Sequence, residues 1–207
     1  MRPISSNNCT PTEKLAAWLV NEMRKYPIIH GKSVKNSIEL VEQMKALELR
    51  RNEILVSFDV TALFPSVPVS GALQSLRAHL ERTSAPSNHV EAYLAVAELC
   101  MKQNYFSFRS KFYQQTYGLS MGNKLSPLLA EVFMADLEEN VQKDKAFPRI
   151  WKRYVDDVFA VTKERLLPQT LNLFNAQYPS IKFTVEKKKK VNYRFWTFLF
   201  LGKKTTR

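Results

Sequence analysis

Three aspartates stand at the ends of apolar segments and have the chemistry to hold divalent cations. Asp59 lies near the end of the apolar segment 54–60, and Asp156 and Asp157 lie between two further apolar segments. Short apolar runs rich in β-branched residues predict strands, so the acidic pair is expected in the turn of a hairpin. Burying three carboxylates on adjacent strand ends is costly unless cations compensate their charge.

Mg²⁺ is the cation that this set of ligands favours, because it takes hard oxygen ligands and keeps positions open for water and substrate phosphates. In two-metal phosphoryl transfer one ion activates the attacking oxygen and the other stabilises the leaving group. Two Mg²⁺ ions are therefore the expected cofactors, with Mn²⁺ as an alternative. An Asp-Asp pair between strands is more commonly a plain exposed turn, so the functional interpretation depends on Asp59 and the pair together.

The spacing of apolar residues predicts a chain of mixed helices and strands. Alternating aromatic residues in 105–115 predict a hairpin with its turn at 109–111. Ser126 is a candidate N-cap, with Pro127 at the first position of the helix that follows. The expected helices are 12–25, 33–50, 69–82, 88–103, 128–140 and 163–176, and the expected strands are 54–60, 149–155, 158–162, 181–185 and 195–202.

The composition indicates a folded chain with a basic end. The 207 residues are 45% hydrophobic and 24% charged, which is ordinary globular usage and suggests neither disorder nor a coiled coil. The formal net charge is +12, but nine Lys or Arg residues against one acid fall within 182–207. This basic run is either a solvated end or a strip that contacts phosphates, so charge supports a nucleic-acid partner only weakly.

Other sequence signals are mainly negative. No window holds the roughly 18 uncharged apolar residues of a membrane span, and the first residues lack the apolar run of a signal peptide, so no membrane partner and an intracellular site are expected. Cys9 and Cys100 have no metal-ligand or CxxC spacing and are expected to be reduced and unpaired. The three histidines are scattered and suggest no zinc site.

Three segments, taken in order, resemble motifs A, B and C of reverse transcriptases. They are Phe58-Asp-Val-Thr-Ala-Leu-Phe-Pro-Ser-Val-Pro, Gly118-Leu-Ser-Met-Gly-Asn-Lys-Leu-Ser-Pro-Leu-Leu-Ala-Glu-Val-Phe-Met and Arg153-Tyr-Val-Asp-Asp-Val-Phe-Ala-Val. Tyr-Val-Asp-Asp with correctly ordered A and B motifs is highly specific, and the closest similarity is to Penelope-like retroelements. The hairpin 105–115 and the segment 181–186 resemble the same group, so the resemblance covers nearly the whole chain.

The resemblance implies a role for each matching residue. Asp59 and Asp156 would bridge the two metal ions, Asp157 would assist from the same turn, and the backbone carbonyl of Val60 would be a further ligand. Phe64 matches the steric-gate position, where an aromatic ring under the sugar excludes a 2′-hydroxyl and favours dNTPs. Core packing is the plainer role of a phenylalanine.

The loop 118–127 and two basic segments are implied to contact the nucleotide. Gly122 lacks a Cβ, so the backbone there could approach the incoming nucleotide or the template closely. Met121 stands where many reverse transcriptases have Gln, so this contact would rest on backbone and packing. Arg2 resembles the end of a fingers motif that meets the triphosphate, or is a disordered terminus. Lys187 to Lys190 occupy the place of a lysine that protonates pyrophosphate, and no single one is favoured.

Aromatic and basic side chains alternate along the hairpin 105–115. They could stack on a nucleic-acid strand and follow its backbone. A half-buried hairpin has the same pattern without any ligand. The sequence leaves these two interpretations open.

The resemblance implies a single reverse transcriptase domain over 1–207, with an α/β fold of the α+β kind: an antiparallel palm sheet backed by helices, with partial fingers. Residues 1–52 and 69–115 would supply fingers and palm helices and the hairpin, and 53–68 and 116–200 the palm motifs. The thumb and endonuclease regions of the family are not evident.

The implied activity is RNA-directed DNA polymerisation in a retrotransposable element, with dNTPs added to a primer 3′-hydroxyl. The implied partners are an RNA template and a DNA primer, in the nucleus, and the oligomeric state is not indicated. One alternative is a catalytically inactive nucleic-acid-binding remnant of such an element. Another is a nucleotidyl cyclase or an RNA-templated RNA polymerase on a similar palm, although Phe64 speaks against RNA synthesis.

Overall fold

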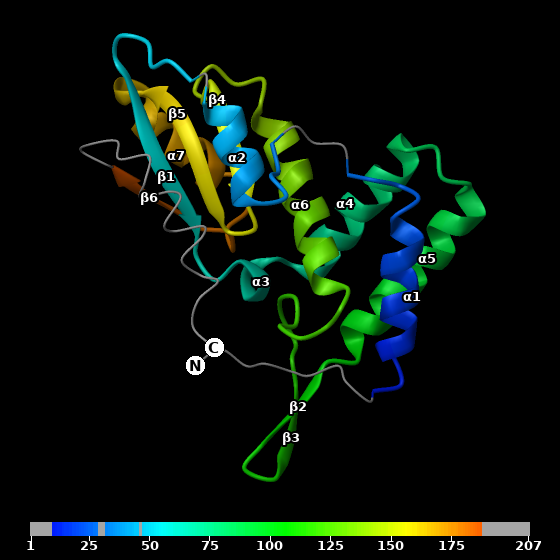
Figure 1. Ribbon diagram of the computed structural model, residues 1–207. Helices are drawn as coiled ribbons and strands as arrows, with labels where there is room; N and C mark the ends of the chain where they lie inside the picture. The colour runs from blue at the N-terminus through cyan, green and yellow to red at the C-terminus, as the bar shows by residue number, and fades with distance from the viewer. Residues whose placement is uncertain (1–9, 29–31, 46, 188–207) are drawn as a thin grey trace. The chain divides into compact units, whose positions relative to one another are not determined.

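The computed structural model describes residues 10–28, 32–45 and 47–187, which belong to two compact units. Of the described residues, unit 1 takes in 10–28 and 62–140, and unit 2 takes in 32–45, 47–61 and 141–187. Each unit combines two segments that are distant in the sequence, and Figure 1 labels their elements. The single domain with alternating fingers and palm segments remains a prediction.

A four-stranded antiparallel sheet forms the centre of unit 2. Strand β1 lies inside the sheet and pairs with strands from much later in the chain on both of its sides. The predicted mixture of helices with an antiparallel sheet is confirmed, and each strand lies within two residues of its predicted bounds. In spatial order the strands are β4 (Ile150–Tyr154), β5 (Asp157–Lys163), β1 (Glu53–Val60) and β6 (Phe183–Lys187).

Helices cover the two faces of this sheet (Figure 1). On one face α7 (Leu167–Asn175) places Phe174 against Trp151, with ring centroids 4.1 Å apart, and Phe58 of β1 also contacts Trp151 at 5.2 Å. On the other face α2 (Ser37–Met44) contributes Leu40 to a second buried cluster. The members of that cluster are Val34, Leu40, Leu55, Phe159 and Val161. Because side chains alternate along a strand, these two clusters establish which β1 residues face which helix.

A bidentate ion pair joins the start of β1 to the start of β4. Arg149 Nε and Nη2 donate to the two carboxylate oxygens of Glu53 at 2.8 and 2.7 Å. The Glu53 side chain is 3% exposed, and the backbone N–H of Arg50 also donates to it at 2.9 Å. The hydrogen bonds from Arg149 lower the pKa of Glu53 from 4.5 to about 2. The carboxylate is therefore more acidic in the folded chain than in the unfolded chain.

Glu53→Gln is expected to remove a pH-dependent part of the stability of unit 2. A carboxylate with a lowered folded pKa stabilises the fold above its unfolded pKa, and this contribution is lost as the pH falls from 4.5 to about 2. At pH 7 the free energy of unfolding of the variant should be only about 1 kcal/mol lower than that of the parent chain, because Arg149 is partly exposed and solvent weakens the ion pair. Denaturant titrations across this pH range measure the difference.

The matched control for this prediction is Glu42→Gln, because Glu42 is an exposed acid of α2 in the same unit. The free energy of unfolding of Glu42→Gln should equal that of the parent chain at every pH. A Glu53→Gln variant whose stability follows the parent in parallel from pH 7 to pH 2.5 would show that the ion pair contributes nothing measurable.

Four longer helices and one short helix form the helical part of unit 1 among the described residues, and their apolar residues build its core. Helix α4 buries Ala72, Leu76 and Leu80, which follow one another at intervals of four residues. The predicted helix at 69–82 has the observed bounds of α4. The short helix α3 (Leu63–Ser66), which follows the left-handed residue Ala62 (φ 48°), was not predicted. The four helices are α1 (Glu13–Met23), α4 (Val69–Arg82), α5 (Ser87–Lys102) and α6 (Ser126–Val141).

The predicted hairpin is confirmed in unit 1. Strands β2 (Tyr105–Phe108) and β3 (Lys111–Gln114) pair with each other in a two-stranded antiparallel sheet. The two turn residues, Arg109 and Ser110, both have positive φ, at 50° and 59°. Such turns match the twist of the flanking strands but usually contain glycine or asparagine.

The helix predicted at 33–50 is wrong in its bounds, because α2 spans only Ser37–Met44. The Asn36 side chain accepts a hydrogen bond from the backbone N–H of Glu39 at 2.9 Å and so caps the helix there. The preceding residues bond to β4 instead: Val34 N–H donates to the Arg153 carbonyl at 2.9 Å, and Arg153 N–H donates to the Lys32 carbonyl at 2.8 Å. A tertiary pairing therefore overrides the helical pattern.

Several smaller expectations are corrected or lie outside the described residues. The β4–β5 turn consists of Val155 and Asp156, and Asp157 is already the first residue of β5. The helix predicted at 163–176 is a 3₁₀ turn, η1 (Glu164–Leu166), followed by α7. The strand predicted at 195–202 lies outside the described residues.

None of the helices in the described part of the chain is long and apolar enough to cross a membrane. Cys100 is a buried free thiol, and its burial raises its pKa. Cys9 lies outside the described residues.

Candidate active site

Asp59 and Asp157 are direct partners in the antiparallel pairing of β1 with β5. One position further on, Val60 N–H donates to the Asp156 carbonyl at 2.9 Å. Hydrogen-bonded and non-hydrogen-bonded pairs alternate in antiparallel sheets, so the two aspartates form a non-hydrogen-bonded pair, the type with the closer side chains. The register therefore brings two carboxylates together and places Asp156 at the adjoining turn.

The two paired aspartates belong to the sheet face that carries the α2 cluster. Asp59 follows Leu55 by four residues on β1, and Asp157 precedes Phe159 by two residues on β5, so alternation puts them on that face. None of the three carboxylates is fully buried: Asp59 is exposed, and Asp156 and Asp157 are half-buried. They occupy the end of the sheet, beyond the apolar cluster, where solvent and solutes reach them.

The turn that carries Asp156 has an unusual backbone. Val155 has a φ of 58°, in the left-handed region that β-branched residues rarely adopt. Arg153 is 1% exposed, and its Nη1 donates to the Val155 carbonyl at 3.4 Å. Sequence analysis assigned no role to this buried arginine. A basic residue inside an otherwise apolar strand was the available signal, and the guanidinium supports the carbonyl next to Asp156.

The donor set of these strand ends suits a hard divalent cation. Three carboxylates belong to Asp59, Asp156 and Asp157, and the carbonyl of Val60 points toward the same side of β1 as its N–H, which faces Asp156. In the described part of the chain, no group of three or more His, Cys, Asp and Glu side chains is gathered as a metal centre. The fit therefore rests on the chemistry of the donors and on the strand register.

Within unit 1, the helical turn that carries Phe64 is held by the loop 118–127. Leu119 N–H donates to the Phe64 carbonyl at 2.8 Å. Phe64 itself is half-buried in α3, and Met121 of the loop is also half-buried. The structure therefore connects the residue predicted as the steric gate to the loop predicted to contact the nucleotide.

Gly118 is the loop position with the strictest steric requirement. Its φ is 77°, and a Cβ added there would lie 2.3 Å from the carbonyl oxygen of Pro65. Gly122, the glycine predicted to approach the nucleotide, is exposed and has a φ of 124°. The signal for Gly118 was its place at the start of the loop, but its contact with Pro65 joins segments more than 50 residues apart.

A comparison with protein families decides what kind of chain this is. The family described as "Reverse transcriptase (RNA-dependent DNA polymerase)" matches residues 1–204. The chain belongs to this family. The predicted resemblance to reverse transcriptases is thus confirmed, and the Penelope-like subtype stays a prediction. No curated protein sequence matches this reverse transcriptase domain.

The solved structures that are similar to this reverse transcriptase domain include telomerases and viral RNA-dependent RNA polymerases. Apo telomerase from Candida tropicalis has a TM-score of 0.60 and 11% identity over 89% of this chain and 37% of the telomerase. Telomerase from Candida albicans, in complex with a TWJ fragment of telomeric RNA, has a TM-score of 0.55 and 15% identity over 88% of this chain and 35% of the telomerase.

One of the RNA-dependent RNA polymerases is that of BmCPV at elongation state. It has a TM-score of 0.57 and 11% identity over 86% of this chain and 18% of the viral polymerase. These likenesses support the fold of the reverse transcriptase domain. The domain spans well under half of each of these polymerases.

The loop of the reverse transcriptase domain is anchored by Asn123, a buried residue that sequence analysis overlooked. Its Oδ1 accepts from Leu125 N–H at 3.0 Å, and its Nδ2 donates to the Cys100 carbonyl at 3.1 Å. The predicted N-cap role of Ser126 is wrong. Ser126 is already the first helical residue of α6, and its Oγ is buried without a hydrogen-bond partner among the described residues.

Two predicted sites of the reverse transcriptase domain lie outside the described residues, wholly or in part. Arg2 is not described. Lys187 ends β6, opposite Val56 of β1, while Lys188 to Lys190 are not described. Their roles at the triphosphate and the pyrophosphate therefore stay predictions.

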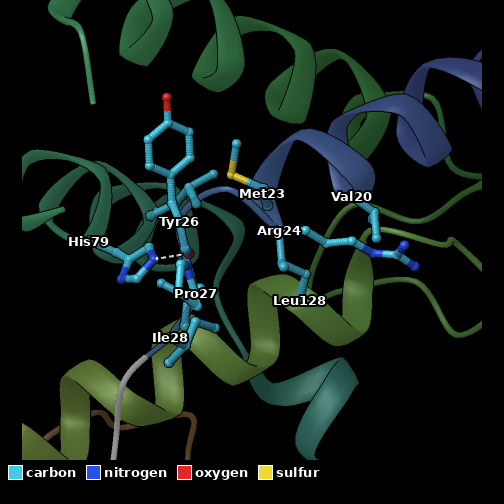
Figure 2. A pocket seen from close by; sticks show the side chains of 10 residues that line it. Val20, Met23, Arg24, Tyr26, Pro27, Ile28, His79 and Leu128 are labelled. Carbon is cyan, nitrogen blue, oxygen red and sulfur yellow. Dashed lines mark hydrogen bonds between the residues drawn. The ribbon is translucent and has the colours of Figure 1, made fainter. Parts of the chain in front are cut away.

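Unit 1 of the reverse transcriptase domain also has a mainly apolar pocket of about 340 Å³, lined by residues of α1, of the segment 24–28 that follows it, and of α4 and α6 (Figure 2). The His79 ring lies at its wall, with Nε2 2.9 Å from the Tyr26 carbonyl oxygen. A carbonyl oxygen only accepts, so this nitrogen donates. None of the residues predicted to bind the nucleotide lines the pocket.

Proposed function

We propose that this chain is the catalytic part of an RNA-directed DNA polymerase of a retrotransposable element, which adds dNTPs to the 3′-hydroxyl of a primer. The observation that carries the proposal is the register of β1 and β5, which sets Asp59 opposite Asp157 and Asp156 in the adjoining turn, in a member of the reverse transcriptase family.

The acidic strand ends would hold two Mg²⁺ ions, or Mn²⁺ in their place. Asp59, Asp156, Asp157 and the carbonyl of Val60 would be the protein ligands of these ions. When bound, the ions supply activation of the attacking 3′-hydroxyl and stabilisation of the leaving pyrophosphate. The chain itself positions the carboxylates. Antiparallel pairing holds Asp59 and Asp157 at one end of the sheet, and Arg153 supports the β4–β5 turn that carries Asp156.

Phe64, Met121 and Gly122 would form the walls for the incoming nucleotide. Phe64 would lie under the sugar and exclude a 2′-hydroxyl, and the hydrogen bond from Leu119 would keep its helical turn in place. Backbone at Gly122 would approach the base or the template. Arg2 would meet the triphosphate, and one lysine among Lys187 to Lys190 would donate a proton to the pyrophosphate.

An RNA template and a DNA primer are the proposed partners. Shape and backbone contacts would recognise their A-form hybrid. The similar solved structures support a nucleic-acid partner, since one is a telomerase with bound telomeric RNA and another an RNA polymerase at elongation state. A Penelope-like element and a nuclear site belong to the same proposal.

The test is extension of a DNA primer annealed to an RNA template by the purified chain. Extension with dNTPs in Mg²⁺, and none after chelation, is the expected result. A folded sample that binds the hybrid but never extends the primer would overturn the proposal for this chain and favour a nucleic-acid-binding remnant. Extension with rNTPs alone would instead favour an RNA polymerase.

Phe64→Ala is expected to relax the choice of sugar. Removing the ring opens space for a 2′-hydroxyl, so the ratio of kcat/KM for dNTPs over rNTPs should fall by about ten- to two-hundredfold, the usual range for a steric pocket. Phe64→Tyr keeps the ring and should retain the parent ratio. Single-nucleotide extension with each sugar measures it. An unchanged ratio in Phe64→Ala would assign the ring to core packing.

A further inference from the structure

The hairpin β2–β3 exposes most of its aromatic side chains to solvent. Phe112 is 83% exposed, Tyr105 55%, Tyr113 43% and Phe108 42%. The two strands pair with each other, and Figure 1 shows them extending away from α5. The half-buried hairpin that the sequence left open as an explanation is therefore not observed. Exposed aromatic surface of this density usually marks an interaction site.

The two faces of the hairpin differ in chemistry. Pairing of Phe106 with Tyr113 and of Phe108 with Lys111, together with alternation along each strand, puts these four residues on one face, here called the basic aromatic face. Phe106 and Tyr113 stack with ring centroids 5.5 Å apart, and the Arg109 guanidinium lies 5.3 Å from the Phe108 ring centre. The opposite face carries Tyr105, Ser107, Phe112 and Gln114 and has no charged residue.

The hairpin itself carries charge of one sign, from Arg109 and Lys111. Between Glu98 and Glu131 the sequence has no acidic residue and four basic ones, two of them at the hairpin tip. Lys102 and Lys124 form ion pairs with Glu98 and Glu13 at 2.7 and 2.8 Å. Arg109 and Lys111, at the tip, form no ion pair with a described residue. A polyanion is therefore the partner that charge complementarity selects.

Hydrogen bonds at its base tie the hairpin to the loop 118–127. Gln115 N–H donates to the Asn104 carbonyl at 2.9 Å, and Gln114 Nε2 donates to the Lys102 carbonyl at 2.9 Å. Asn123 of the loop donates from Nδ2 to Asn104 Oδ1 at 3.4 Å. The same hydrogen bonds therefore fix the base of the hairpin and the loop, so a nucleic-acid strand bound to the hairpin would lie at a fixed position relative to the loop.

We propose that the basic aromatic face is a stacking platform for single-stranded nucleic acid. Every base has a π-face, so rings bind successive bases with little sequence preference, and cations beside the rings bind the phosphates. Protein interfaces also use aromatic residues and arginine, and it is the positive charge of the tip, without an acidic residue on either strand, that selects a polyanion. The proposal rests on the proposed function, in which a template must reach the catalytic residues as a single strand.

Binding of a fluorescein-labelled oligo(dT) or oligo(rU) of about 12 nucleotides, a typical length for such sites, tests the platform by anisotropy. The full chain is used with a chelator, so binding is measured without catalysis. Phe108→Ala and Tyr113→Ala should each weaken binding about five- to one-hundred-fold. Arg109→Gln should reduce the slope of log K against log salt concentration by about one, the value for one lost phosphate contact. A fully paired duplex of the same length should bind these variants and the parent alike.

Phe112→Ala is the matched control, because it removes a more exposed ring from the opposite face of the same hairpin. It should change oligonucleotide affinity less than about twofold, and thermal melts should show that all variants fold. Equal losses from both faces, or no loss from either, would overturn the proposal. So would self-association that only Phe108→Ala and Tyr113→Ala abolish while oligonucleotide affinity stays unchanged, since that assigns the face to a second copy.

The outcome is independent of polymerase activity. A chain that never extends a primer but binds oligonucleotides through the basic aromatic face would refute the proposed function and leave the platform standing. Glu42→Gln, which changes an exposed acid of α2 outside the acidic strand ends, should bind the oligonucleotide as the parent does in chelator.

Discussion

Asp59→Asn is expected to lower primer extension at least about a thousandfold while it raises the thermal stability of the metal-free chain. The loss of activity corresponds to about 4 kcal/mol of transition-state stabilisation, within reach of a lost metal ligand. The gain in stability follows from the register, because Asp59 and Asp157 are direct partners in a non-hydrogen-bonded pair. Like charges placed opposite each other destabilise a sheet.

The size of the stability gain can be estimated from cross-strand pairs. Removing the repulsion is worth about 0.2–1 kcal/mol, which for a chain of this size is a rise in Tm of roughly 0.4–4 °C. Added Mg²⁺ should raise the Tm of the parent chain, because a ligand that binds only the folded state stabilises it, and should raise that of Asp59→Asn much less. Thermal melts with chelator and with Mg²⁺ measure both effects.

Glu42→Gln is the control for the lost charge, since Glu42 is exposed on α2 and lies outside the acidic strand ends. It should retain extension and respond to Mg²⁺ as the parent does. Asp156→Ala should lose extension as Asp59→Asn does. If Asp59→Asn extends primers at a rate near that of the parent, the acidic strand ends are not the catalytic site.

Gly118→Ala is expected to produce the largest loss of stability in unit 1. The added Cβ would lie 2.3 Å from the Pro65 carbonyl oxygen and 2.7 Å from the Pro65 Cα, so backbone must move rather than a side chain. The positive φ of 77° adds about 1 kcal/mol for any residue with a Cβ. Together these should cost about 3 kcal/mol or more, a drop in Tm of roughly 6–12 °C.

The same variant should also lose extension activity in the chain that remains folded, because the displaced segment includes Leu119, whose N–H bonds to the Phe64 carbonyl. Gly71→Ala is the matched control: its Cβ would meet only side-chain atoms of Phe133 and Pro68, at 3.1 Å, within a regular helix. It should change the Tm by about 2 °C or less. Equal Tm values for the two variants would contradict the backbone clash.

The local sequence pattern predicted the bounds correctly for elements whose own residues carry a clear helical or alternating period. Helix α4 and the hairpin β2–β3 were predicted with nearly their observed bounds, since apolar residues at helical spacing and alternating aromatics are local signals. The prediction failed at α2, where residues 32–34 pair with Arg153 of β4, far away in the chain. It also missed α3, a single turn whose carbonyl at Phe64 bonds to Leu119.

The amino-acid sequence by itself determined which residues could hold metal ions and which family the chain belongs to, because residue types and the order of short motifs survive without any knowledge of contacts. Only the tertiary structure decided that Asp59 lies opposite Asp157, that Gly118 meets Pro65 and that the aromatic rings of the hairpin face solvent. Each of these features depends on which distant segments of the chain pack together and which surfaces no other segment covers. Strand register and burial are set by this tertiary packing, which the local sequence does not specify.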